Sequence, residues 1–300
     1  MRNVDAVIIG AGPAGVTSAI YLKRYGYEIA LLDPMGVGGQ LMMINEIENY
    51  PGFKNATGFK LAQDFEEQLN FLGSEVEYTL VKSIEKTEDG KFLLKTDVDD
   101  IQTRGIIIAT GAKHSKLGIP GEDKFEGKGV SYCATCDGPF FKNKKVVVVG
   151  GGDTALTDAL YLAKLCSEVI LVHRRDQFRA QKILQDRVKN EEKIKCVMKA
   201  NVVSINGEEK VTSVTLDNGE TIQTDGIFIF TGIVPTSELF EDLTEMDNRG
   251  FIITNGKMET SHKGIFAAGD VRNTALRQVV TATGDGAVAA ASMDEYLSNN

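Results

Sequence analysis

Two cysteines lie close together near the middle of the chain, in the run Cys133-Ala134-Thr135-Cys136-Asp137. Two thiols at this spacing can close a small disulfide ring, and the motif can lower a thiol pKa so that a thiolate is available near neutral pH. Asp137 follows at once, and a carboxyl group there can protonate a departing thiolate or take a proton from a thiol. The run therefore predicts thiol–disulfide chemistry, with Cys133, Cys136 and Asp137 as catalytic residues.

A Cys-x-x-Cys pair can also be half of a zinc site, which usually needs four ligands and often two such pairs. The sequence has one such pair, and none of its three histidines, His114, His173 and His262, lies within a few residues of it. Of the other cysteines, Cys166 ends an apolar helical stretch and Cys196 lies in a lysine-rich segment before a strand pattern. We therefore expect a redox pair, no metal, and structural roles for Cys166 and Cys196.

Glycine-rich turns follow two apolar runs with the spacing of a dinucleotide-binding site. Gly10-Ala11-Gly12-Pro13-Ala14-Gly15 follows residues 6–9, and Gly150-Gly151-Gly152-Asp153-Thr154-Ala155 follows residues 146–149. The first glycine permits a tight turn, the second lets the backbone approach a pyrophosphate, and a small third residue packs the helix closely on the strand. The pyrophosphate then meets free N–H groups at the helix N-terminus, so each turn predicts one bound dinucleotide.

The residues after the second strand of each copy indicate which nucleotide binds. In the first copy this residue is Asp33, whose carboxylate can accept hydrogen bonds from ribose hydroxyls and would repel a 2′-phosphate. In the second copy the run is His173-Arg174-Arg175, with Arg179 four residues further on, and three arginines suit a 2′-phosphate. A solvated basic helix start is the alternative, but the position after strand two favours a ligand role. We assign FAD to the first site and NADPH to the second, with the flavin taking a hydride from NADPH.

An internal duplication shows which elements must position these residues. Gly10 to Asp33 and Gly150 to His173 both span 23 positions, and a helix pattern and a second apolar strand lie between them in each copy. Each unit has the size of a parallel strand–helix–strand crossover. Residues 105–111 and 226–232 are a further repeat, because both are apolar strand patterns that end in Thr-Gly. Equal spacing argues against chance similarity, so we predict an α/β fold with two Rossmann-like dinucleotide-binding domains.

Composition excludes several other classes of protein. The net charge is −9, which opposes nucleic-acid binding as the main activity because such binding needs a basic surface. No apolar run reaches the roughly 18 residues that a membrane span needs. The first residues lead directly into a strand pattern without a signal-peptide leader. We therefore expect a two-domain protein of the cytoplasm that has neither nucleic acid nor membrane as a partner.

Taken together, these residues resemble the low-molecular-weight thioredoxin reductases of the FAD- and NADPH-dependent pyridine nucleotide-disulfide oxidoreductases. The resemblance covers the whole chain, and the Cys-Ala-Thr-Cys-Asp-Gly run between the two nucleotide motifs is its most diagnostic part. The other matching stretches, besides the two glycine motifs and the arginine cluster, are residues 38–41, 48–52, 178–180, 264–270 and 277–282.

The resemblance implies an activity and an arrangement of domains. It implies a homodimeric thioredoxin-disulfide reductase in which Cys136 faces the flavin and Cys133 attacks the disulfide of thioredoxin. It also implies that the FAD domain is split between residues 1–114 and 245–300, with the NADPH domain inserted as residues 115–244. FAD would then also be held by residues 33–40, by Asn49 and by the C-terminal segment 270–279.

The candidate ligands follow from the motifs and the resemblance. For FAD they are Gly10, Gly12, Pro13, Ala14, Gly15, Asp33, Gly38, Gly39, Gln40, Asn49, Thr110, Gly111, Gly269, Asp270, Arg277, Gln278 and Val279. For NADPH they are Gly150, Gly152, Asp153, Thr154, His173, Arg174, Arg175 and Arg179.

Three departures from the family pattern leave the redox pair and the arginines untouched. They are Pro139, at a position that is often aromatic or small, Thr157-Asp158 in place of an acidic pair, and residues 231–236, which lack an asparagine after the proline. They bear on partner preference or helix packing. One alternative function is a reductase of another dithiol carrier, such as a glutaredoxin-like protein, or of a peroxiredoxin system. The other is a non-enzymatic flavoprotein sensor.

Motion is also expected, because the cysteines and NADPH both need the flavin ring and the cysteines must also meet a whole protein. We predict that the inserted domain rotates on two linkers, near residues 114–120 and 241–248. Phe140 and Phe141 are candidate docking residues for the partner, and buried packing is their alternative role.

Overall fold

The chain folds into two compact units. The computed structural model describes residues 1–44, 47, 49–54 and 56–299. Met1–Lys113 and Val234–Asn300 together form the first unit, and His114–Ile233 forms the second. The chain thus enters the second unit at His114 and leaves it after Ile233, whereas the sequence placed the return after residue 244. Both units combine parallel strands with helices, so the predicted α/β class is confirmed.

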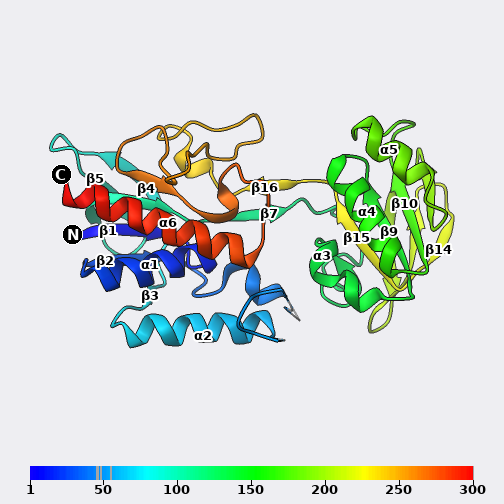
Figure 1. The fold of residues 1–300 in the computed structure, drawn as a ribbon, viewed down its shortest axis with the longest axis horizontal. Coiled ribbons are helices and arrows are strands. Elements are labelled where there is room, and N and C mark those ends of the chain that lie inside the picture. The colour runs from blue at the N-terminus through cyan, green and yellow to red at the C-terminus, as the bar shows by residue number, and fades with distance from the viewer. Residues whose placement is uncertain (45–46, 48, 55, 300) are drawn as a thin grey trace. The chain divides into compact units, whose positions relative to one another are not determined.

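A mixed sheet forms the centre of the first unit (Figure 1). In the described residues its strand order is β3-β2-β1-β6-β5-β4, and β17 also pairs with β6. The strands are β1 (Arg2–Ile9), β2 (Ile29–Leu32), β3 (Val76–Glu77), β4 (Val81–Lys86), β5 (Phe92–Thr96), β6 (Ile101–Ile108) and β17 (Ile265–Ala267). β1 is parallel to β2 and β6, and β17 is parallel to β6, so their carboxyl ends share one edge of the sheet.

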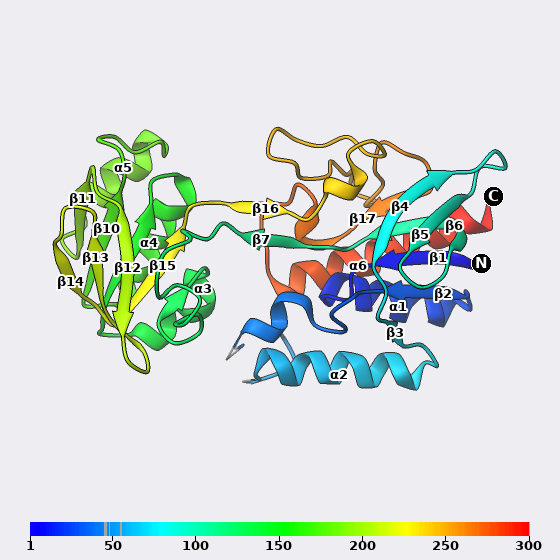
Figure 2. The same ribbon diagram turned by 180° about the vertical axis from the view of Figure 1, so that it is seen from behind.

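Helices cover one face of this sheet. The helical elements of the unit are α1 (Pro13–Tyr25), α2 (Gly58–Phe71), α6 (Val279–Ser298), and the short 3₁₀ turns η1 (Gly39–Met43), η3 (Glu238–Phe240) and η4 (Gly269–Val271). α1 and α6 lie side by side in both views (Figures 1 and 2), and Ser18 Oγ donates to the Gly286 carbonyl at 3.0 Å. Along β1, Ala6 and Ile8 face the helices while Val7 and Ile9 face the opposite core.

The second unit repeats the strand–helix–strand pattern of the first. Its main sheet has the order β11-β10-β9-β15-β8, and β12, β13 and β14 form a separate sheet. The elements are β8 (Val130–Ser131), α3 (Ala134–Asp137), η2 (Gly138–Phe141), β9 (Lys145–Gly150), α4 (Asp153–Leu165), β10 (Glu168–His173), α5 (Lys182–Lys189), β11 (Ile194–Met198), β12 (Val202–Gly207), β13 (Val211–Leu216), β14 (Thr221–Gln223) and β15 (Gly226–Phe230). Val146 and Val148 of β9 pack on α4, and Val147 and Val149 pack on the smaller sheet.

Two short strands carry the chain from one unit to the other. They are β7 (Ala112–His114) and β16 (Ile233–Pro235), and they pair in a two-stranded sheet. Among the described helices, none has the length and apolar character needed to cross a membrane.

Candidate active site

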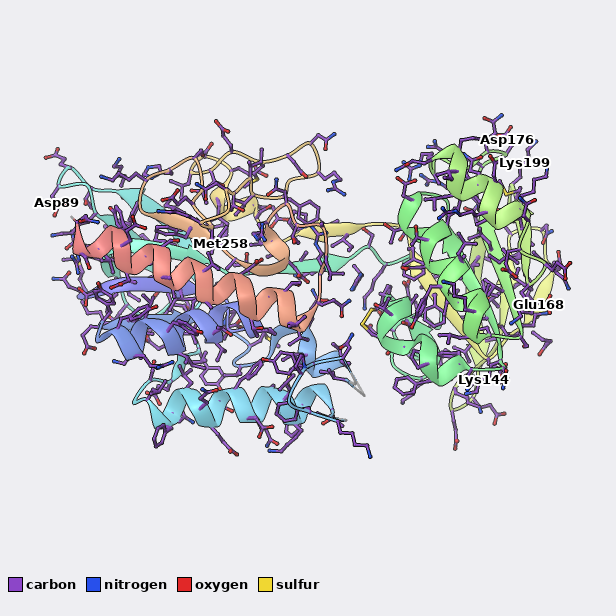
Figure 3. All side chains as sticks on the ribbon, in the orientation of Figure 1. Asp89, Lys144, Glu168, Asp176, Lys199 and Met258 are labelled. Atoms are coloured by element: carbon purple, nitrogen blue, oxygen red, sulfur yellow. A yellow bond between two sulfur atoms is a disulfide. The ribbon has the colours of Figure 1, made fainter. Side chains whose placement is uncertain are left out.

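The redox pair lies at the start of a short helix in the second unit, and its disulfide is the yellow bond of Figure 3. Cys133 and Cys136 are joined, with their Cα atoms 5.3 Å apart, and both side chains are half-buried. Cys133 is the N-cap of α3, where its Sγ accepts a hydrogen bond from the Cys136 backbone N–H at 3.2 Å. A backbone N–H directed at a sulfur favours the thiolate form, so reduced Cys133 is placed to act as a nucleophile.

Asp137 ends the same helix, and its backbone N–H donates to the Cys133 carbonyl at 3.1 Å. Burial raises the pKa of the Asp137 carboxyl, and a hydrogen bond with Ser131 partly opposes this. The Ser131 hydroxyl also donates to the Cys133 carbonyl at 3.2 Å and accepts from the Cys133 N–H at 3.1 Å. Ser131 therefore connects the carboxyl group to Cys133, a contact that the sequence did not reveal.

Replacement of Asp137 by asparagine should slow thiol–disulfide exchange at neutral pH by about a hundredfold, as for the loss of a general acid–base group. Because burial raises the pKa of Asp137, the carboxyl keeps its proton to a higher pH than an exposed aspartate. Exchange that uses this proton should fall as pH rises through the raised pKa, and the asparagine variant should lack this alkaline limb. Rapid-mixing rates of the reduced protein with a disulfide substrate across pH would test this, and an unchanged pH profile would contradict it.

The two phenylalanines after the pair differ in environment. The ring of Phe141 packs edge-on against Phe228 with centroids 5.2 Å apart, and a Cβ added at Gly226 would overlap it at 2.2 Å. Phe141 thus takes the packing role. Phe140 is half-buried and, among the described residues, does not belong to the hydrophobic cluster that contains Phe141 and Phe228. It remains the candidate for partner docking.

The predicted FAD residues gather at the carboxyl edge of the first sheet. Ile9 is in register with Leu32 and Ile108, and Ile108 is in register with Ala267. The glycine turn, Asp33, the Thr110-Gly111 dipeptide and the Gly269-Asp270 dipeptide follow these four strand ends. One edge of the sheet therefore brings together motifs that are far apart in the sequence.

The glycine turn has the geometry of a pyrophosphate cradle. Gly10 has φ +103°, and a Cβ added at Gly15 would lie 1.8 Å from the Gly10 carbonyl oxygen. Gly12, the N-cap of α1, differs because a Cβ there would meet no protein atom within 4 Å. The first turn of α1 has no side-chain cap, so its N–H groups face this open space and can receive an anion.

The Asp33 carboxylate, which was predicted to bind ribose hydroxyls, is hydrogen-bonded to the glycine turn. Its two carboxylate oxygens accept from the N–H groups of Ala11 and Met35, each at 2.8 Å. Each oxygen keeps a lone pair for a ribose hydroxyl. Gly38 and Gly39 have positive φ values of 120° and 53°, and Gly39 lies beside Gly12.

The remaining FAD candidates form two connected groups. Asn49 donates to the Gln278 side chain at 3.0 Å, and Gln278 caps α6 through Thr281. Gln40 donates to the Ala112 carbonyl. Glu48, which belongs to the matching stretch 48–52, lies outside the described residues.

Asp270 lies in a charged cluster that the sequence motif did not reveal. Burial raises the pKa of Asp270 to about 6, and the nearby Arg277 guanidinium partly lowers it. Arg272 forms a bidentate ion pair with Asp285 at 2.6 and 2.8 Å, and Asp285 also accepts from the Gly269 N–H at 3.1 Å. Arg272 and Asp285 thus fix the turn that carries Asp270. In the sequence, the position of Arg272, two residues after Asp270, was the one feature that pointed to this ion pair.

Arg277 is directed at the protein's own backbone. Its guanidinium lies 4.2 Å from the centre of the Phe251 ring and donates to the Arg272 carbonyl at 3.2 Å. It also contacts the carbonyls of Asp270 and Thr274. These contacts favour an indirect role for Arg277, in which it shapes the turn at Asp270.

The second glycine turn follows β9 in the other unit. Gly150 has φ +156°, and a Cβ there would lie 2.6 Å from the Ala155 Cβ, so helix and strand pack closely. Gly152 is the N-cap of α4 and, like Gly12, has open space where a Cβ would point. Asp153 accepts from the Gln181 backbone N–H at 2.7 Å, which fixes the start of α5.

His173 and the arginines differ in their exposure. His173 is 5% exposed, stacks on Phe178 at 5.3 Å, and lies beneath Gly151, where a Cβ would overlap its ring. Burial lowers the pKa of His173, so it supports the turn as a neutral ring. The side chains of Arg174, Arg175 and Arg179 are exposed, and within the described residues none of them forms an ion pair. Three unpaired guanidiniums after β10 are available for a phosphate.

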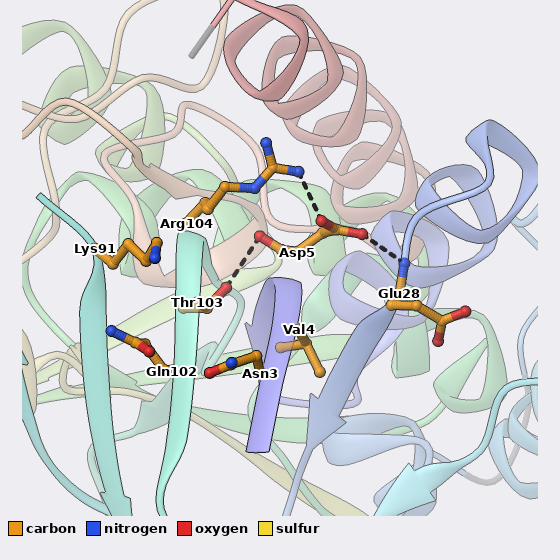
Figure 4. A pocket seen from close by; sticks show the side chains of 8 residues that line it. All are labelled: Asn3, Val4, Asp5, Glu28, Lys91, Gln102, Thr103 and Arg104. Carbon is orange, nitrogen blue, oxygen red and sulfur yellow. Dashed lines mark hydrogen bonds and ion pairs between the residues drawn. The ribbon is translucent and has the colours of Figure 1, made fainter. Parts of the chain in front are cut away.

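A hollow lies at the other edge of the first sheet (Figure 4). It has a volume of about 330 Å³ and is lined by residues that include Asp5, Glu28, Thr103 and Arg104. Asp5 pairs with Arg104 at 2.6 Å and accepts from the Glu28 N–H at 2.9 Å. Its polar groups bind one another, and we assign the chemistry to the carboxyl edge instead. Among the described residues, no three histidine, cysteine or acidic side chains are grouped to hold a metal ion.

Comparison with known proteins extends over nearly the whole chain. Residues 4–286 match the family model described as pyridine nucleotide-disulphide oxidoreductase. The chain is 44% identical over 299 residues to a thioredoxin reductase of Bacillus subtilis, covering 98% of this chain and 94% of that protein. It is 43% identical over 301 residues to a thioredoxin reductase of Treponema pallidum, covering 98% and 97% of the two chains.

Solved structures agree with these relatives. The thioredoxin reductase from Streptococcus pyogenes is 41% identical, with a TM-score of 0.94 over 99% of each chain. The Lactococcus lactis thioredoxin reductase in its FR conformation is 44% identical, with a TM-score of 0.68 over 99% of this chain and 100% of that one.

Proposed function

The chain belongs to the pyridine nucleotide-disulphide oxidoreductase family, and from this premise we propose that it is a thioredoxin reductase that uses NADPH and FAD. The observation that carries the proposal is the Cys133–Cys136 disulfide, which lies in the same unit as a glycine turn followed by three unpaired arginines. The redox pair and the NADPH site are therefore parts of one folding unit.

The residues of the chain fit both nucleotides. The open space at Gly12 would hold the pyrophosphate of FAD and the carboxylate of Asp33 would hold a ribose, with the Asp270 turn as a further contact to FAD. Gly152 and the arginines are placed to hold the pyrophosphate and 2′-phosphate of NADPH. FAD bound at these residues would supply a two-electron carrier between NADPH and the Cys133–Cys136 disulfide.

The chain's own groups carry out the exchange with the protein substrate. In the dithiol form, the Cys133 thiolate attacks one sulfur of the thioredoxin disulfide and displaces the other as a thiolate, which takes a proton. Cys136 then attacks Cys133, releases dithiol thioredoxin and restores the Cys133–Cys136 disulfide. Asp137, whose pKa is raised by burial, is the group that we expect to give and take the proton in these steps.

Steady-state NADPH oxidation with a panel of thioredoxins and glutaredoxins tests the proposal. A thioredoxin should give a kcat/KM at least about tenfold above that of any glutaredoxin. Preference for a glutaredoxin would assign the chain to another dithiol carrier. FAD binding without turnover of either would indicate a flavoprotein sensor.

We further propose a homodimer of the cytoplasm whose two units reorient during turnover. The support for reorientation is the distribution of the groups, because the FAD motif is in the first unit while the redox pair and the NADPH motif share the second. One fixed arrangement cannot serve both the cysteines and NADPH at the flavin and also expose Cys133 to a protein. Light scattering after size-exclusion chromatography tests the dimer.

A further inference from the structure

The two segments that connect the units begin with the same dipeptide. Thr110-Gly111 ends β6 and leads into β7, and Thr231-Gly232 ends β15 and leads into β16. Counted from each threonine, the sixth residue is again a hydroxyl residue, Ser115 in the first segment and Thr236 in the second. The sequence similarity that suggested two similar domains therefore extends into the segments that join the units. We call these two segments, residues 110–115 and 231–236, the connector.

The connector is clamped at its end in the first unit. Thr110 Oγ1 donates to the Thr236 carbonyl at 2.6 Å, and the Thr236 N–H donates to the Gly111 carbonyl at 2.9 Å. All three residues belong to the first unit, and the threonine hydroxyl is partly buried.

The end in the second unit has the same two bonds with the segments exchanged. Thr231 Oγ1 donates to the Ser115 carbonyl at 2.7 Å, and the Ser115 N–H donates to the Gly232 carbonyl at 2.9 Å. All three residues belong to the second unit. Each threonine thus binds the residue that stands five places after the other threonine, in the opposite segment, and the two clamps are reciprocal.

The chain beyond Ser115, within the linker range predicted near residues 114–120, is held by hydrogen bonds to a buried carboxylate. Glu122 is 1% exposed, and its carboxylate accepts from the N–H groups of Leu117 at 2.9 Å and Gly118 at 2.8 Å. The Tyr132 hydroxyl donates to the same carboxylate at 2.8 Å. The other predicted linker, residues 241–248, lies inside the first unit, whereas the chain changes unit between residues 113 and 114 and between residues 233 and 234.

We propose that Thr110 and Thr231 are positioning residues that fasten the two ends of the connector and confine reorientation to Ala112–His114 and Ile233–Pro235. The inference rests on the reorientation put forward under the proposed function. Without a clamp, the end of a strand is free to leave its unit, more orientations become accessible, and the productive one is populated less. Thr110 was expected to bind FAD, but its one hydroxyl hydrogen is already donated to Thr236.

Threonine-to-valine variants test this, because valine keeps the shape and removes the donor. Thr110→Val should slow NADPH-driven flavin reduction about three- to tenfold, the effect of one net hydrogen bond. Thr231→Val should slow the same step by a smaller factor, because its bond is exposed to water. FAD content should stay at the wild-type level in both, and the serine variants Thr110→Ser and Thr231→Ser should restore the rate.

Hydrogen exchange provides a readout that does not depend on activity. Thr110→Val should speed amide exchange at Thr236, and Thr231→Val should speed it at Ser115, each with little change at the opposite end. Thr87→Val is the matched control, because it removes a threonine-to-carbonyl bond in the turn between β4 and β5 and should change neither rate nor connector exchange.

The outcomes separate the inference from the proposed function. Loss of FAD from Thr110→Val, with Thr231→Val unaffected, would make Thr110 a cofactor ligand and overturn the clamp. Unchanged exchange and unchanged reduction rates in both variants would overturn it as well. A wild-type protein whose flavin is not reduced by NADPH would refute the proposed function, while the exchange measurements would still decide on the clamp.

Discussion

Replacing Cys136 by serine is expected to lower the rate of turnover with thioredoxin by about a thousandfold or more. It should also trap the partner as a mixed disulfide on Cys133. The physical reason is that Cys133 can still attack the partner's disulfide, but no thiol remains to resolve the mixed disulfide. Incubation of reduced Cys136→Ser with oxidised thioredoxin, followed by non-reducing electrophoresis and peptide mapping, measures the trapped complex.

Cys133→Ser is the matched control for this trap. It keeps the same number of thiols and should lose turnover to a similar extent while retaining FAD and its reduction by NADPH. The Cys133 N–H and carbonyl both bind Ser131, and serine can preserve these backbone contacts. A partner trapped on Cys136 in the Cys133→Ser variant would reverse the two roles.

Removal of Arg174 and Arg175 should lower the preference for NADPH over NADH by about ten- to a thousandfold. Charge-assisted hydrogen bonds contribute about 1.5–3 kcal/mol each, and exposure to water reduces their effect at this site. In the described residues these guanidiniums have no carboxylate partner, so they lose no internal ion pair when they bind a phosphate. The measurement is kcat/KM with both nucleotides for wild type and for Arg174→Ala/Arg175→Ala.

The control for this variant is Arg187→Ala/Lys189→Ala, in the last turn of α5, which removes the same charge at another exposed position. It should leave the preference for NADPH unchanged. Equal use of NADH and NADPH by the wild type would refute the assignment of the arginine cluster to the 2′-phosphate.

Much of the fold could be predicted because its key positions have a single physical requirement. Gly15 must be glycine, since a Cβ would overlap the Gly10 carbonyl, and such a constraint appears directly in the sequence. The equal spacing of the two copies reflects two helices of the same length, α1 and α4 with 13 residues each, that follow two similar turns. Asp33 could be predicted for a similar reason. It follows a strand that is parallel to the one before the glycine turn, so the two lie side by side at one edge of the sheet.

What the sequence could not reveal depends on contacts between distant residues. His173 is next to the arginines in the chain but packs beneath Gly151, and Arg277 lies on Phe251. The second linker was expected at residues 241–248 because they are polar, but the chain returns to the first unit at Val234. The anchoring of the loop after Ser115 depends on Glu122. A buried carboxylate that binds backbone N–H groups leaves no periodic signal in the sequence.

Anaerobic titration with NADPH tests the central claim most directly, namely that a flavin and the Cys133–Cys136 disulfide act in series within one chain. Each NADPH carries two electrons, and both the flavin and the disulfide are two-electron acceptors. The wild type should therefore consume about two NADPH per chain before the flavin is fully reduced, with two new thiols at Cys133 and Cys136, and the Cys133→Ser/Cys136→Ser variant about one. Wild type and variant with the same stoichiometry, and no new thiols in the wild type, would contradict the account.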